Sequence, residues 1–79
     1  MAATVAFRAS RDIAANTERI HEIFAKHPPR YLISAKVMSA RGRVVRATIW
    51  AYEKNTASLI HAVAKFVTGD YFVSITISN

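Results

Sequence analysis

Apolar residues follow two different spacings along this chain, and the change between them divides it into six segments. Alternation of apolar and polar residues over 4–9, 31–40, 43–53 and 71–78 predicts four strands. Apolar residues at helical spacing predict one helix from a cap at Ser10 to His27. A second helix is predicted from a cap at Asn55 or Thr56 to a stop before Gly69. The predicted order is therefore strand, helix, strand, strand, helix, strand.

This order is typical of an α+β, ferredoxin-like domain, in which two helices cover one face of a four-stranded antiparallel sheet. A chain of 79 residues allows a single domain, which we assign to residues 1–79. The alternation predicts a covered face made of apolar residues: Val5, Phe7, Ile33, Val37, Val45, Ile49, Val73, Ile75 and Ile77. The remaining strand residues form an open face, because the opposite assignment would bury Arg8, Lys36 and Arg46 under the helices.

The third predicted strand has the most distinctive pattern. It reads RGRVVRATIWAY over residues 41–52, so that a cation, a hydroxyl and two large aromatic rings share one side. These residues are Arg46, Thr48, Trp50 and Tyr52. An open face with this composition predicts a binding sheet.

Charge sharpens this prediction, because the net charge is +6 and its distribution is uneven. Between Arg30 and Arg46 there are basic residues and no acidic ones. Such a stretch favours binding to polyanions or to acidic protein surfaces. The chain has no cysteine, no apolar run of membrane-spanning length and no secretory leader pattern. We therefore expect a cytoplasmic protein that binds no cofactor and contacts no membrane.

The favoured interpretation is a small protein that binds RNA or another single-stranded nucleic acid. Aromatic rings on an open sheet stack on bases, and basic side chains contact phosphates. The candidate site combines the residues Arg8, Lys36, Arg41, Arg43, Arg46, Trp50, Tyr52 and Phe72. This arrangement is similar to the RNA-recognition motif in its element order and in the aromatic residues of its third strand. It departs from that family where Arg43 and Val45 stand in place of aromatic residues.

Two alternatives remain open, and the first of them uses the same surface. Leu32, Met38, Trp50, Tyr52 and Phe72 would form an apolar patch that suits a homodimer, or an inhibitor or adaptor of a larger complex, including a viral one. The element order is also similar to that of ACT regulatory domains, which would imply a small-molecule ligand. No nucleophile elbow, phosphate-binding loop or metal-ligand motif is present in the sequence. We therefore expect no enzymatic activity.

Overall fold

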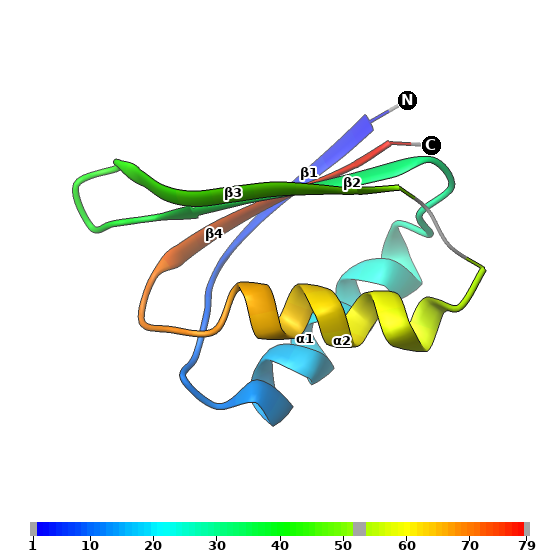
Figure 1. Ribbon diagram of the computed structural model, residues 1–79, viewed down its shortest axis with the longest axis horizontal. Helices are drawn as coiled ribbons and strands as arrows, with labels where there is room; N and C mark the ends of the chain where they lie inside the picture. The colour runs from blue at the N-terminus through cyan, green and yellow to red at the C-terminus, as the bar shows by residue number, and fades with distance from the viewer. Residues whose placement is uncertain (1, 52–53, 79) are drawn as a thin grey trace.

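The six predicted elements and the α+β ferredoxin-like fold are confirmed by a computed structural model of the chain, which describes residues 2–51 and 54–78 (Figure 1). The elements are β1 (Ala2–Arg8), α1 (Ile13–Lys26), β2 (Leu32–Met38), β3 (Val44–Ala51), α2 (Thr56–Phe66) and β4 (Phe72–Ser78). Both helices lie on the same side of the sheet, and the other side is left open.

The sheet is antiparallel and has the strand order β1-β4-β2-β3. Strands β4 and β2 are therefore central, whereas β1 and β3 are the edges. The pairing is regular between β1 and β4 and between β4 and β2. Between β2 and β3 the register shifts at Val37/Met38, near the hairpin that joins the two strands. This register decides which side chains share a face.

The hydrophobic core lies between the helices and the central strands. Its fully buried members include Ile20 from α1, Ile33 from β2, Val63 from α2 and Ile75 from β4. On β1, β2 and β4, the residues predicted to face the helices do so, and all are buried except Val5, which is partly buried. The alternation therefore predicted the face correctly on these three strands.

On β3 the predicted face is wrong. Residues that pair directly across a sheet share a face, and Trp50 pairs with buried Ile33 while Arg46 pairs with buried Val37. Trp50 and Arg46 therefore lie on the helix side, not on the open face. Ile49, which was predicted to face the helices, is 67% exposed, and Val45 is also exposed.

The reversal has a physical cause at the end of α2. Arg46 lies on the helix side and stays exposed. Its guanidinium Nη2 donates a hydrogen bond to the carbonyl of Thr68, 3.0 Å away, just beyond α2. The indole of Trp50 packs edge-on against the ring of Phe66, with centroids 5.4 Å apart. Placing Arg46 on the helix side thus buries no charge. Since β3 is an edge strand, a cation on this side does not have to lie under the helices.

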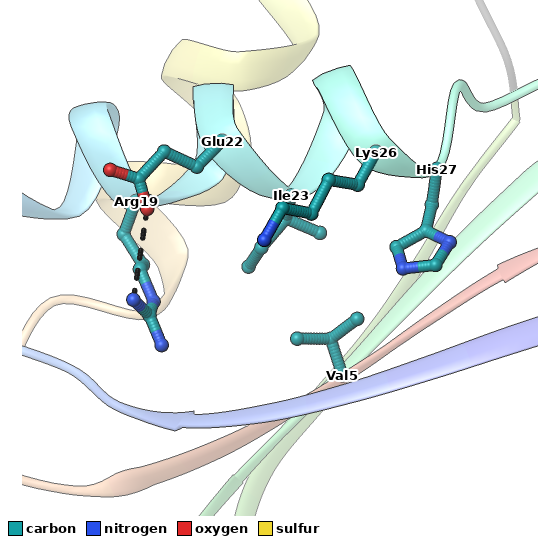
Figure 2. A pocket seen from close by; sticks show the side chains of 6 residues that line it. All are labelled: Val5, Arg19, Glu22, Ile23, Lys26 and His27. Atoms are coloured by element: carbon teal, nitrogen blue, oxygen red, sulfur yellow. Dashed lines mark ion pairs between the residues drawn. The ribbon is translucent and has the colours of Figure 1, made fainter.

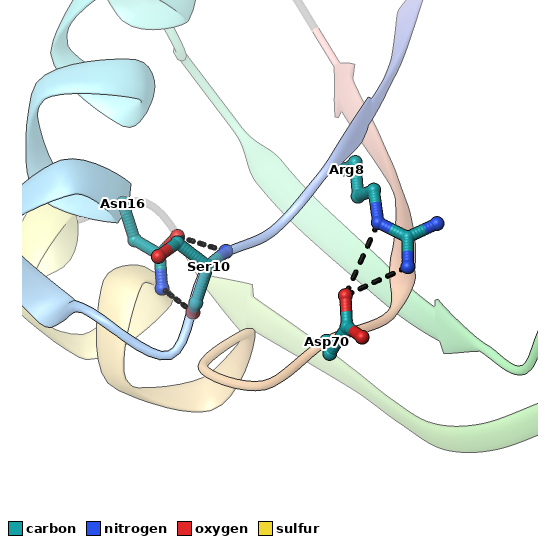
Figure 3. Close-up of polar contacts among 4 residues, drawn as sticks. All are labelled: Arg8, Ser10, Asn16 and Asp70. Atoms are coloured by element: carbon teal, nitrogen blue, oxygen red, sulfur yellow. Dashed lines mark hydrogen bonds and ion pairs between the residues drawn. The ribbon is translucent and has the colours of Figure 1, made fainter.

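The start of α1 also differs from the prediction. Asp12, not Ser10, is the N-cap, and its carboxylate accepts a hydrogen bond from the amide of Ala14 at 3.0 Å. Ser10 is held instead by the buried side chain of Asn16, which accepts from its amide and donates to its carbonyl (Figure 3). Asn55, one of the two residues predicted as the cap of α2, is its N-cap. The β1–α1 loop is therefore fixed against α1 by a buried amide.

Candidate functional site

The open face of the sheet consists of rows of four residues that the strand register places side by side. The two central rows are Thr4–Thr76–Ser34–Ile49 and Ala6–Ser74–Lys36–Ala47. Most of these side chains are small or carry a hydroxyl, and the hydroxyls of Thr4 and Thr76 lie 3.1 Å apart, at hydrogen-bond distance. The centre of the face is therefore a shallow, polar surface with one cation, Lys36.

Larger apolar side chains lie at the margins of this surface. Phe72 and Met38 pair at the end nearest the β2–β3 hairpin, and Leu32 lies at the opposite end. Ile49 stands on the β3 edge. A depression of about 470 Å³ opens between β2 and β3, where Ser34, Lys36 and Ala47 are among its lining residues. The hydroxyls and Lys36 thus lie near the middle of the surface, whereas the hollow beside them is lined mainly by apolar surface, Ile49 included.

Arg8 and Phe72 lie on the open face, as predicted, and they are in contact; Figure 3 shows Arg8 with its other partner, Asp70. The Arg8 guanidinium contacts the Oδ1 atom of Asp70 through Nη2 at 2.7 Å and through Nε at 3.1 Å. Its central carbon lies 5.0 Å from the centre of the Phe72 ring. The ring is therefore covered on one side by a flat cation, whose charge Asp70 partly balances.

The β2–β3 hairpin adds two exposed cations, Arg41 and Arg43, at its tip. The loop is closed by Ser39, whose amide donates to the Arg43 carbonyl at 2.8 Å and whose carbonyl accepts from Gly42 at 2.9 Å. Gly42 has φ +79°, a left-handed conformation that suits glycine. The turn therefore holds both arginines beyond the end of the open face that carries Met38.

Three predicted site residues are not part of this surface as described. Trp50 and Arg46 face the helices, and Arg46 lies over the rings of Phe66 and Tyr71, with centroid distances of 5.7 and 5.8 Å. Tyr52 lies outside the described residues. The structure therefore brings together Arg8, Lys36 and Phe72, flanked by Arg41 and Arg43.

Hydroxyl groups were missing from the predicted site. Ser34, Ser74 and Thr76 lie at the centre of the open face, beside Lys36. The signal was present in the last strand, FVSITIS, in which serine and threonine alternate with buried isoleucine and valine. The alternation placed these residues on the open face, but the predicted site contained aromatic and basic residues alone.

Comparison with known proteins adds no assignment. No protein-family model matches the chain, and no curated protein matches it at a significant level. Within residues 2–51 and 54–78, no three His, Asp or Glu side chains gather where they would hold a metal ion. None of the helices in this described part has the length and apolar character needed to cross a membrane.

Proposed function

We propose that this chain is a small, non-enzymatic cytoplasmic protein that binds single-stranded nucleic acid across the open face of its sheet. The separation of charge carries the proposal. Arg8 and Lys36 lie on this face, and Arg41 and Arg43 extend from its end. Among the described acidic residues, Asp70 adjoins the face, whereas Asp12, Glu18 and Glu22 lie on α1 or at its cap.

Each part of the face has a role in this proposal. Lys36 and the hairpin arginines neutralise phosphates along a strand that crosses the sheet. The hydroxyls beside Lys36 hydrogen-bond sugar and phosphate oxygens. A base stacks on the guanidinium of Arg8, which the Phe72 ring supports from behind. A flexible single strand suits a flat, shallow surface because its bases are free to turn toward the protein.

The same geometry argues against a protein interface as the main function of this face. The centres of stable protein interfaces are depleted of charged residues, whereas Lys36 lies near the centre of this face with the hydroxyls of Ser34 and Ser74. A dimer of open faces would place two stacked sheets about 10 Å apart, a gap that large interior side chains must fill. Here the centre offers Ser34, Ser74 and Lys36, so that each copy would bury a lysine in the seam.

The test is fluorescence anisotropy with a labelled, mixed-sequence single-stranded RNA of about 12 nucleotides. We expect binding that weakens steeply as salt rises from about 50 to about 200 mM. Lys36→Gln and Arg43→Gln should each weaken binding and reduce the salt slope by about one. Lys65→Gln removes an equal charge from α2 and serves as the matched control, since it should leave the affinity within about twofold of the parent protein.

Two results would contradict the proposal. One is the absence of salt-sensitive RNA binding at the lowest salt. The other is a dimer, detected by light scattering, that does not bind RNA and that dissociates in the Ile49→Asp variant. This result would make the open face a protein interface. The Trp50→Ala variant tests on which face Trp50 lies. Because Trp50 faces the helices, the folded fraction of this variant should bind RNA as tightly as the parent protein, whereas a Trp50 on the open face would be needed for stacking.

A further inference from the structure

A groove separates α1 from the edge of the sheet at β1 (Figure 2). Its volume is about 110 Å³, and Val5 from β1 and Ile23 from α1 lie on its apolar side. Arg19, Glu22, Lys26 and His27 supply its polar lining from α1 and its C-cap. This groove lies on the helix side of the sheet and shares no residue with the open face.

The floor of the groove borders a free strand edge. Within the described residues, β1 pairs with β4 on one side and with no strand on the other. Its pairing from Ala2 to Arg8 is continuous, and the strand contains no proline. Bulges, prolines, charged side chains or a covering helix or loop usually protect a free edge, and the charged residue of β1 is Arg8, at its end. By contrast, the other edge, β3, is irregular near Val37/Met38.

Cationic side chains from α1 overhang this edge. Figure 2 shows Arg19 extending from the helix toward β1 and Lys26, two turns further on, running back along the helix toward Ile23, and both side chains line the groove. Glu22 meets Arg19 at 3.7 Å, a long and exposed contact, and the Arg19 guanidinium lies 5.7 Å from the ring of Phe7. In the groove, the carboxylate of Glu22 thus lies among two cationic side chains, Arg19 and Lys26, and the imidazole of His27. The groove has an excess of positive charge above a row of unpaired backbone groups.

We propose that an extended acidic segment of a partner protein binds here by adding a strand to β1. The free edge supplies backbone hydrogen bonds, which is the usual basis of strand addition. Arg19 and Lys26 are seven residues apart, or about 10.5 Å along the helix. Two acidic residues four positions apart share a face of a strand and are about 13.6 Å apart, and the long side chains of Arg19 and Lys26 span the difference of about 3 Å. The apolar residue midway between them packs on Val5 and Ile23.

The probe is a synthetic peptide of sequence Thr-Glu-Thr-Val-Thr-Glu-Thr with blocked ends, titrated into the isotopically labelled protein and followed by NMR. We expect amide shifts along β1 and slower hydrogen exchange of the β1 amides that face outward. Replacing both peptide glutamates by glutamine should weaken binding about two- to fivefold. Replacing the peptide valine by proline should abolish it, since proline cannot continue the ladder of hydrogen bonds.

Matched protein variants locate the site. Lys26→Gln should weaken peptide binding about two- to fivefold, whereas Lys65→Gln, on α2, should not. No saturable shift on β1, shifts confined to the Arg41–Arg43 hairpin, or equal binding of the proline peptide would overturn the proposal. RNA binding at the open face is measured independently, so either proposal can fail without the other.

Discussion

Strands β2 and β3 are neighbours joined by one hairpin, and both show alternating sequences, yet their environments differ. On β2, Ile33, Ala35 and Val37 are buried beneath the helices. On β3 no residue is buried, and only Thr48 and Trp50 are partly covered. Within the described residues, β2 has a strand on each side, whereas β3 pairs with β2 alone. An alternating sequence therefore predicts a strand, and the position of that strand in the sheet decides what the alternation means.

The largest expected difference compares two isoleucines, one in each kind of strand. Ile75→Ala, on central β4, should lower the free energy of unfolding by about 2–5 kcal/mol, because Ile75 is 0% exposed and its truncation leaves a cavity. Ile49→Ala, on β3, should change it by no more than about 0.5 kcal/mol, since this side chain is 67% exposed. Urea denaturation followed by circular dichroism measures both. Equal losses would mean that β3 faces the core as its sequence suggested.

The fold was predictable because local signals agreed with the global architecture. Six periodic segments, ended by Pro28-Pro29, the Arg41-Gly42 turn and Gly69, allow few arrangements other than a split βαβ sheet. The face of β1, β2 and β4 followed from alternation, because helix cover makes one face of each strand strictly apolar. The β3 face did not follow, since valine, alanine and isoleucine on one side competed with tryptophan and threonine on the other.

The candidate site was predictable to the same extent. Arg8, Lys36 and Phe72 were placed correctly, because each sits on a strand whose other face is buried. Trp50 and Arg46 were misplaced, because their contacts with Phe66 and Thr68 depend on where α2 ends. Such contacts join residues far apart in the sequence. No spacing rule along the chain reveals them.

An intermediate effect is expected at Trp50, which is half-covered by the helix layer. Trp50→Ala should lower the free energy of unfolding by about 1–3 kcal/mol, less than a fully buried tryptophan, because its edge contact with Phe66 is lost. Trp50→Phe should recover more than half of this loss, since a smaller ring still reaches Phe66. Thermal and urea unfolding by circular dichroism provide the values. A neutral Trp50→Ala variant would contradict the helix-side placement and restore Trp50 to the open face.

The smallest expected effect concerns Arg46, which links the edge strand β3 to the loop after α2 by a hydrogen bond. Its guanidinium donates to the Thr68 carbonyl and lies over two aromatic rings, but the residue is exposed. Arg46→Ala should therefore cost about 0.5–1 kcal/mol of unfolding free energy. Arg46→Lys should lose nearly as much, because an ammonium group keeps the charge without the flat surface that stacks on Phe66 and Tyr71. If the Arg46→Lys variant had the unfolding free energy of the parent protein, the positive charge near the end of α2, and not the stacking on the two rings, would account for the stabilisation. If the Arg46→Ala variant were also as stable as the parent protein, the pairing of β3 with β2 would be sufficient to hold β3 in the sheet.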